Sequence, residues 1–298
     1  MSSVKLAGSL VALITPFKDG AVDEPGLRAL VEYHIKNGTN GIVPCGTTGE
    51  SVTLSEVEHE RVVRIVTETV AGRIPVVAGA GTNSTAKSIK LAKEAKHAGA
   101  DAILVVTPYY NRPTQQGLYL HYESIAKAVD IPIVVYNVPS RTGTNLLPET
   151  LARLSRIPQV VAVKEASGSM DQVSQIIRDC GPDFAVLSGD DSLTLPIVAL
   201  GGQGVISVVA NIAPKAMSDL VALYRCGKTE EARALHYELF ELCRTMFVET
   251  NPIPVKAAAA MLGLCDGEMR LPMCPPSEAN RAKIKDVLDR CKHVQRLS

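Results

Sequence analysis

At positions 160–168 the chain reads VVAVKEASG, a short apolar run that ends on Lys164. A run of this length, rich in β-branched residues, predicts a buried strand. Side chains alternate along a strand, so Val160, Ala162 and Lys164 are expected on one face, which we take to be interior. Burial there would lower the pKa of Lys164 below its reference value of about 10.4, because an apolar face does not solvate an ammonium.

A lysine that is partly neutral near pH 7 is a nucleophile. Its free amine attacks carbonyl carbon and forms a Schiff base, which makes Lys164 a candidate for covalent catalysis. The alternative is a structural lysine whose ammonium pairs with Glu165 or reaches solvent. The rest of the chain has to decide between these two interpretations.

Further apolar runs bring the number of predicted short strands to eight. They lie at residues 9–14, 41–43, 75–78, 102–106, 133–136, 160–164, 185–188 and 204–208, and helix-period stretches such as 24–36, 55–70, 85–96 and 114–129 separate them. Ser55-Glu56-Val57-Glu58 has the pattern of a capping box, and Ser84-Thr85 can cap the next helix. This alternation indicates repeated βα units with parallel strands.

Eight βα units in this length predict an α/β fold, a (β/α)8 TIM barrel, rather than an open nucleotide-binding sheet. No G-x-G-x-x-G motif is present, and a tight turn explains the nearest approach at 79–82. After Pro214 the chain reads as helical at 216–225, 229–249, 255–262 and 279–292, which exceeds one closing helix. We expect a catalytic barrel over residues 1–225 and a C-terminal helical extension over residues 226–298.

Composition excludes several function classes. The 31 Lys plus Arg residues equal the 31 Asp plus Glu residues, so no basic surface is expected to attract nucleic acid or anionic lipid. No apolar run approaches the ~20 residues of a membrane span and the N-terminus lacks a signal-peptide pattern, which favours a cytoplasmic location. The seven cysteines have no C-x-x-C motif and the six histidines no ligand spacing, so we expect neither a disulfide framework nor a metal site.

Polar residues follow the predicted strands at their carboxyl ends, where the active site of such a barrel lies. They include Thr47 and Thr48 after the second strand, Tyr109 and Tyr110 after the fourth, Tyr136 and Arg141 at the fifth, and Gly189 after the seventh. Each has a structural explanation when taken singly, such as a turn, loop packing or a surface ion pair. Together with Lys164 they supply a nucleophile, hydroxyls that move protons and a cation that holds a carboxylate, which favours a lyase or aldolase.

Four motifs carry a resemblance to a known family. The segments 46–50 (GTTGE), 109–113 (YYNRP), 136–143 (YNVPSRTG) and 163–168 (VKEASG), supported by 188–191, 204–207 and 251–256, resemble the 4-hydroxy-tetrahydrodipicolinate synthases. The likeness spans nearly the whole chain. It implies a (β/α)8 barrel with a C-terminal helical extension, assembled as a homotetramer (a dimer of dimers). It also implies the condensation of pyruvate with L-aspartate-4-semialdehyde in the diaminopimelate route to lysine, with a covalent imine and no cofactor.

The resemblance implies a role for each catalytic residue. Lys164 would form the imine with C2 of pyruvate, and Tyr136 would donate and accept the protons. Thr47 would link Tyr136 to Tyr110, which in the family comes from a neighbouring subunit.

The resemblance also assigns the substrate-binding residues. Thr48 would hold the pyruvate carboxylate, and Gly189 and Ile206 would line the imine pocket. Arg141 would engage the carboxylate of the semialdehyde through its guanidinium fork.

An effector site is the last feature that the resemblance implies. Ser51, His59, Asn83 and Tyr109 match the pocket in which family members bind L-lysine, whereas Glu56 and Lys87 depart from it. An ammonium facing an ammonium repels, so we expect feedback by L-lysine to be weakened, altered or absent. Glu56 could supply the missing carboxylate or pair with Lys87, and both could also be plain surface charges of a helix.

Two alternatives remain open at this stage. A relative that uses the same lysine, such as N-acetylneuraminate lyase or a 2-keto-3-deoxy sugar-acid aldolase, would act on a polyhydroxylated substrate, which neutral residues serve better than Arg141. A non-catalytic descendant would bind a keto acid as a sensor, because a fold alone does not establish activity. The set of Lys164, Tyr136, Thr47 and Tyr110 argues against such a sensor.

Overall fold

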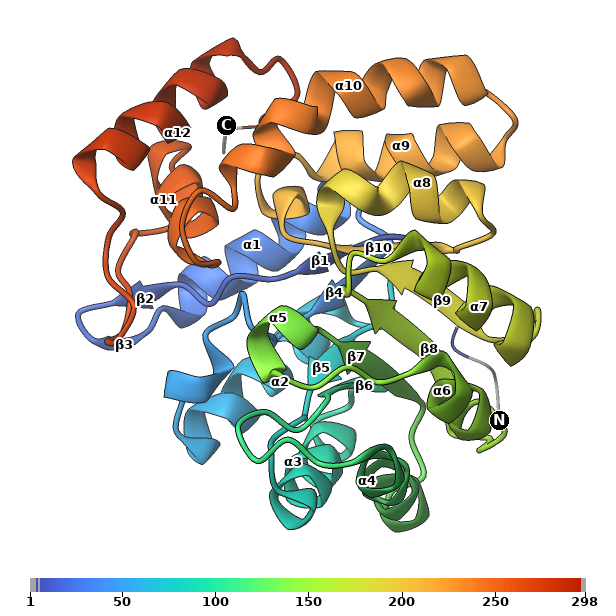
Figure 1. The fold of residues 1–298 in the computed structure, drawn as a ribbon. Coiled ribbons are helices and arrows are strands. Elements are labelled where there is room, and N and C mark those ends of the chain that lie inside the picture. The colour runs from blue at the N-terminus through green and yellow to red at the C-terminus, as the bar shows by residue number, and fades with distance from the viewer. Residues whose placement is uncertain (1–3, 5, 296–298) are drawn as a thin grey trace.

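Eight parallel strands form a closed barrel in the computed structural model, which describes residue 4 and residues 6–295 (Figure 1). The strands are β1 (Gly8–Ala12), β4 (Gly41–Val43), β5 (Val77–Gly79), β6 (Ala102–Val106), β7 (Ile133–Asn137), β8 (Val160–Glu165), β9 (Ala185–Ser188) and β10 (Gly204–Ser207). Their order is β4-β1-β10-β9-β8-β7-β6-β5, and a parallel bridge between Ile42 and Val76 joins the two ends. The predicted eight-stranded barrel is therefore confirmed, with strand ends that agree to within two residues.

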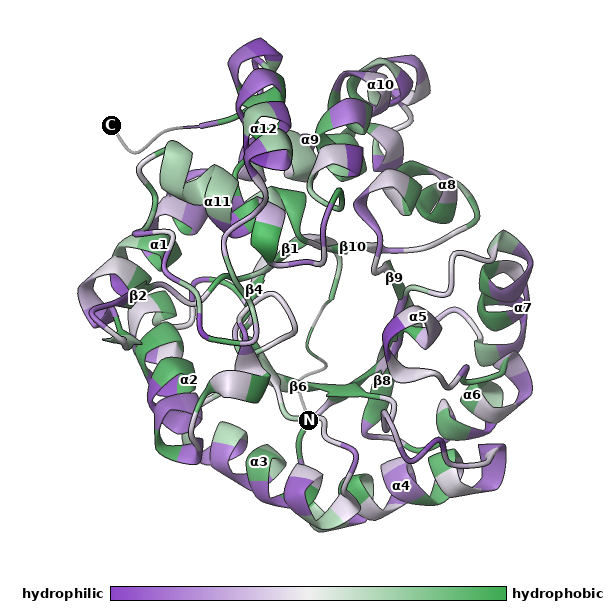
Figure 2. Ribbon diagram, turned by 60° about the vertical axis from the view of Figure 1, so that its left-hand side comes forward, coloured by the Kyte–Doolittle hydropathy of each residue, from purple (hydrophilic) through white to green (hydrophobic). Residues whose placement is uncertain are grey.

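Helices surround the strands on the outside, as the view along the barrel shows (Figure 2). They are α1 (Glu24–Lys36), α2 (Glu56–Val70), α3 (Thr85–His97), α4 (Gln115–Ala128), α6 (Pro148–Leu154), α7 (Met170–Cys180), α8 (Thr194–Ala199) and α9 (Pro214–Arg225). The predicted capping box at Ser55 and Glu58 is present at the start of α2, and Ser84 caps α3. These caps satisfy amide groups that the first helical turn leaves without partners.

Short elements also lie in the loops that follow the carboxyl ends of several strands. A hairpin of β2 (Phe17–Lys18) and β3 (Ala21–Val22) lies outside the barrel. The loops hold α5 (Pro139–Thr142) and the 3-10 turns η1 (Ser51–Thr53), η2 (Asp191–Leu193) and η3 (Val209–Asn211). The sequence patterns did not predict these pieces, because none is long enough to show a hydrophobic period.

Two layers of core result from strands that are covered on both faces. The inner cluster fills the barrel and includes Leu10, Leu104, Val134, Ala162 and Ile206. The outer cluster lies between strands and helices and is built mainly from Val, Ile, Leu and Ala. Lys164, at 4% exposure, therefore ends a strand whose inner face is apolar.

One prediction about this strand is wrong. Val160 does not share a face with Ala162 and Lys164, because it packs in the outer cluster while Ala162 packs in the inner one. The register explains the difference: Ile133 pairs with Val160 but Val134 pairs with Ala162, so β8 carries one extra residue at this point. Such a bulge resets the alternation, and only the residues beyond it keep the expected facing.

The C-terminal extension consists of α10 (Thr229–Thr245), α11 (Ile253–Met261) and α12 (Glu278–Arg290). The helix predicted over 229–249 ends at Thr245, because the following turns carry the chain back toward the barrel, where Asn251 meets Thr48. Among the described residues, no helix is both long and apolar enough for a membrane crossing.

Candidate active site

Lys164 and Tyr136 face each other on neighbouring strands at the carboxyl end of the barrel. They are register partners of β8 and β7, and the ammonium nitrogen lies 4.4 Å from the centre of the tyrosine ring. Burial lowers the pKa of Lys164 to about 8, Asp191 opposes this shift, and Arg141 adds to it. The buried lysine that the sequence predicts is therefore present, and none of the described residues forms an ion pair with it.

Glu165 is not the partner of Lys164, which removes the structural alternative considered above. Its carboxylate accepts hydrogen bonds from Asn137 Nδ2 at 3.0 Å, Gln172 Nε2 at 3.3 Å and the Ser167 amide at 2.6 Å. Successive residues of a strand point to opposite faces, so Glu165 lies outside the barrel when Lys164 lies inside. The Asn137–Glu165 contact ties β7 to β8 directly beyond the Tyr136–Lys164 pair.

Tyr136 is placed to exchange protons. Burial raises the pKa of its phenol, while Arg141 and a hydrogen bond with the Thr47 side chain oppose that rise. The phenol thus remains protonated near neutral pH and can donate. Its contact with Thr47 is the first link of the proton relay that the resemblance implies, and the second link, Tyr110, is 91% exposed on its own chain.

The loop that carries Thr47 and Thr48 adopts a tight and specific shape. The amide of Gly49 donates to Gly46 O at 3.1 Å, and a Cβ at Gly49 would lie 3.0 Å from Leu13 O. A side chain at this position would crowd the Leu13 carbonyl, which favours glycine. The Thr48 hydroxyl, in a side chain that is 2% exposed, accepts a hydrogen bond from Asn251 Nδ2 at 3.0 Å.

Asn251 is a residue to which the sequence assigned no role. Besides its bond to Thr48, its backbone carbonyl accepts from the guanidinium of Arg141 at 3.0 Å. It therefore joins the residue predicted to hold pyruvate to the residue predicted to hold the second substrate. A separation of 203 residues from Thr48 hid this contact from any local pattern.

Gly189 lies against the lysine, and Ile206 belongs to the inner core cluster of the barrel. A Cβ built on Gly189 would lie 3.2 Å from Lys164 Cγ and 2.7 Å from Ala166 Cβ, so a larger residue would push against the lysine. Ile206 is fully buried in the inner cluster with Tyr136 and Leu187. Neither residue adds a polar side chain to the charges of Asp191 and Arg141 that act on Lys164.

A cavity of about 490 Å³ opens beside this group. Its lining brings together Thr47, Tyr136 and Arg141 with all of the predicted effector residues, namely Ser51, Glu56, His59, Asn83, Lys87 and Tyr109. Lys164, Thr48, Gly189 and Ile206 are not part of the lining, and Tyr110 is on the surface. Within the described residues, no group of His, Cys, Asp and Glu has the arrangement of a metal site.

The comparison with known proteins decides the family. Residues 5–291 match the Dihydrodipicolinate synthetase family. The chain belongs to this family. A 4-hydroxy-tetrahydrodipicolinate synthase from Citrifermentans bemidjiense is 56% identical over 287 residues, which cover 96% of this chain and 99% of that relative.

Solved structures of the dihydrodipicolinate synthetase family agree with the fold. The dihydrodipicolinate synthase from Aquifex aeolicus is 49% identical, with a TM-score of 0.95 and coverage of 97% of this chain and 99% of that one. The chloride-inhibited enzyme from Acinetobacter baumannii, complexed with pyruvate, is 46% identical with a TM-score of 0.95 and coverage of 97% and 100%. The TIM barrel and the assignment to the lyases are confirmed, and the relatives' names favour the synthase over the sugar-acid alternatives.

The structure decides against one of the alternatives left open for Glu56 in the predicted effector site. Glu56 does not pair with Lys87; its carboxylate lies 2.5 Å from the ammonium of Lys90, almost one turn further along α3. His59 is buried, its Nε2 lies 2.8 Å from Gly79 O, and burial lowers its pKa. The cavity therefore holds a neutral imidazole near pH 7, together with the charges of Glu56 and Lys87.

Proposed function

We propose that this enzyme condenses pyruvate with L-aspartate-4-semialdehyde to give 4-hydroxy-tetrahydrodipicolinate, a step of the diaminopimelate route to lysine. The observation that carries the proposal is the buried, unpaired Lys164 with its lowered pKa, placed against the ring of Tyr136. With a pKa of about 8, about one amine in ten is neutral at pH 7, against roughly three in ten thousand for an ordinary lysine. Reactivity toward a carbonyl rises accordingly.

The reaction would proceed through a covalent intermediate. The Lys164 amine attacks C2 of pyruvate, and loss of water, with protons passed by Tyr136, gives the imine. Removal of a methyl proton produces an enamine, whose carbon attacks the aldehyde of the second substrate. No cofactor is needed, because the protonated imine itself accepts the electron pair.

The binding residues divide between the two substrates. We assign Thr48 to the pyruvate carboxylate and Gly189 and Ile206 to the walls around the imine. Arg141, exposed at the mouth and anchored on Asn251, would hold the semialdehyde carboxylate through two parallel hydrogen bonds. Thr47 would pass protons between Tyr136 and Tyr110 of a neighbouring subunit, which the exposure of Tyr110 in the single chain supports.

Several further assignments belong to the same proposal. We propose a homotetramer built as a dimer of dimers, a cytoplasmic location, and neither nucleic acid nor membrane as a partner. We also propose the division into a catalytic barrel over residues 1–225 and a helical extension over residues 226–298. Size-exclusion chromatography with light scattering tests the assembly.

Two measurements test the activity. Incubation with pyruvate followed by borohydride should leave one reduced pyruvate adduct per chain on the peptide that contains Lys164, and Lys164→Ala should abolish it. A coupled assay with pyruvate and L-aspartate-4-semialdehyde should show turnover. An adduct that persists in Lys164→Ala would contradict the assignment of the nucleophile, and turnover confined to sugar acids would contradict that of the substrate.

A further inference from the structure

The loop that carries Thr47 and Thr48 ends on Glu50, whose backbone is left-handed with a φ of 52°. A residue other than glycine is strained in this region and stays there only when its surroundings hold it. The amide of Glu50 donates to Thr47 O at 3.1 Å, so this strained residue closes the turn that displays both threonines. Whatever holds Glu50 therefore sets the positions of Thr47 and Thr48.

Glu50 is held by an ion pair buried against the C-terminal extension. Its Oε1 lies 2.5 Å from Nζ of Lys256 on α11, and the two side chains are 2% and 1% exposed. The lysine ammonium also lies 4.1 Å from the centre of the Phe17 ring. The other carboxylate oxygen accepts from the backbone amide of Arg270 at 3.3 Å, so residues of the extension engage both oxygens.

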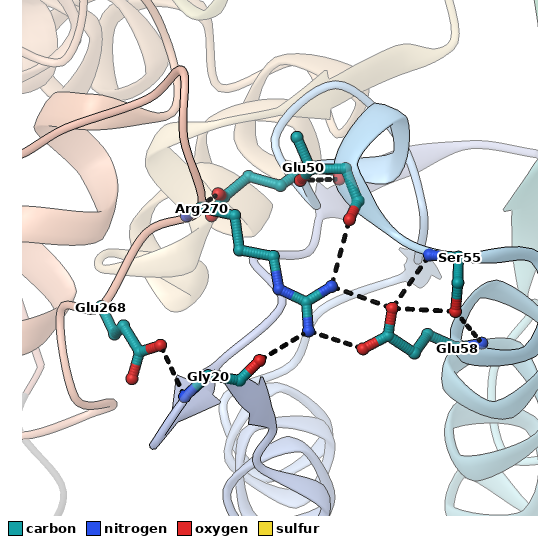
Figure 3. Close-up of polar contacts among 7 residues, drawn as sticks. Gly20, Glu50, Ser55, Glu58, Glu268 and Arg270 are labelled. Carbon is teal, nitrogen blue, oxygen red and sulfur yellow. Dashed lines mark hydrogen bonds and ion pairs between the residues drawn. The ribbon is translucent and has the colours of Figure 1, made fainter.

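Arg270 fixes the same loop from the outside, as Figure 3 shows. Its guanidinium donates to both carboxylate oxygens of Glu58 and to the carbonyls of Thr53 and Gly20. The central carbon of the guanidinium also lies 4.4 Å from the centre of the Phe17 ring, which Lys256 contacts as well. The chain beyond Glu50 is thereby tied to the start of α2, to the outer hairpin and to the extension.

A second contact from the same part of the extension reaches the loop one residue before Gly49. Asn251, five positions before Lys256 in sequence, donates to the Thr48 hydroxyl at 3.0 Å. The segment 251–256 thus forms hydrogen bonds to the loop on both sides of Gly49, at Thr48 and at Glu50. A loop held at two neighbouring points by one segment has little freedom to tilt.

We propose that Glu50 and Lys256 are positioning residues through which the C-terminal extension fixes Thr47 and Thr48 for imine formation. The inference rests on the proposed function, which gives the two threonines their roles. Stability alone is a weak reason for such a pair, since well-packed apolar residues can often replace a buried ion pair without loss. An apolar pair cannot supply the directional ion pair that holds the strained Glu50, and with it the conformation of the turn.

The first test separates positioning from general stability. Lys256→Met should lower kcat/KM for pyruvate by about a hundredfold, mostly through KM, because a displacement near 1 Å costs that much in a reacting site. Combining Glu50→Gln with Lys256→Met removes the uncompensated charge, and the double variant should recover severalfold relative to Lys256→Met alone. Leu262→Ala, a buried change in the same extension, should lower Tm and leave KM within twofold of the wild type.

A second pair of variants covers the case in which Lys256→Met does not fold. Glu50→Asp keeps the charge but withdraws the carboxylate by one methylene, and it should raise the KM for pyruvate about tenfold with little change in Tm. Lys256→Arg has a longer reach and should restore KM when it is added to Glu50→Asp. If Glu50→Asp folds with an unchanged KM, or if every loss of activity follows Tm as in Leu262→Ala, the positioning role is wrong.

The wild-type enzyme distinguishes a failure of this inference from a failure of the proposed function. If borohydride traps no pyruvate on the wild type, the proposed function is wrong and with it the assigned roles of the threonines. If the wild type is trapped and the variants are trapped at the same rate, only the positioning role fails. If pyruvate is trapped on the wild type and trapping is slower in Lys256→Met and Glu50→Asp, both the proposed function and the positioning role are supported.

Discussion

Replacing Lys164 by methionine should stabilise the fold while it abolishes activity. The pKa of Lys164 lies at about 8 in the folded protein, against an ordinary value of 10.5. The folded state therefore binds this proton more weakly than the unfolded state does, and the charged lysine opposes folding. This cost is fully present below pH 8, falls as pH rises from 8, and vanishes above about 10.5.

The magnitude follows from the size of the shift. The difference between a pKa of 10.5 and one of about 8, at about 1.4 kcal/mol for each tenfold change, gives about 3.5 kcal/mol below pH 8. Solvent screening reduces this free energy little, because Lys164 is 4% exposed. Methionine has a similar length and no charge, so Lys164→Met should raise Tm by about 5 °C at pH 7 for a chain of this size.

The assay is thermal unfolding of the wild type and the variant at pH 7, 9 and 10.5, without pyruvate. Lys256→Met is the matched control, since it also removes a buried ammonium but one that pairs with Glu50. It should lower Tm, because breaking a buried pair leaves a charge without compensation. A Tm that falls in Lys164→Met, or a gain that is the same at pH 7 and 10.5, would refute the claim that Lys164 is desolvated without a partner.

Three other changes test the remaining roles. Arg141→Lys should retain the borohydride-trapped pyruvate adduct but lose efficiency toward L-aspartate-4-semialdehyde, because an ammonium cannot form two parallel hydrogen bonds; unchanged kinetics with the semialdehyde would count against this role. Tyr110→Phe should lower turnover and spare imine formation, and hybrids with Lys164→Ala subunits should regain activity if the site is shared. Initial rates across millimolar L-lysine should show little inhibition of the wild type, and Lys87→Glu should gain it, by roughly 10- to 100-fold in affinity; strong saturable inhibition of the wild type would overturn this expectation.

The sequence predicted the parts of the fold that depend on local patterns. The eight strands and the cap at Ser55 follow from hydrophobic period and cap chemistry, both of which are read within a few residues. The bulge in β8 could not be predicted, since nothing in a run of valines marks the residue that the neighbouring strand skips. The facing of Val160 was wrong for this reason.

In the candidate site, the sequence failed mainly to predict contacts between residues that are far apart in the chain. Lys164 could be recognised because a charge at the end of an apolar strand is unusual. Lys256 lies in an alanine-rich helix, where no local pattern indicates that it is buried. Its partner Glu50 is 206 positions away. Pairings of this kind are decided by how the extension lies on the barrel, which a single sequence does not encode in any short pattern.

The register of Tyr136 with Lys164 has a consequence for how this scaffold can change. The two reactive groups stand on neighbouring strands, locked by backbone hydrogen bonds, whereas Arg141 stands on the short α5 beyond them. On the proposed roles, the imine chemistry depends on these two strands, and the choice of the second substrate depends on a loop that can vary independently. Engineering toward another aldehyde should therefore diversify residues 139–143 and leave both strands untouched.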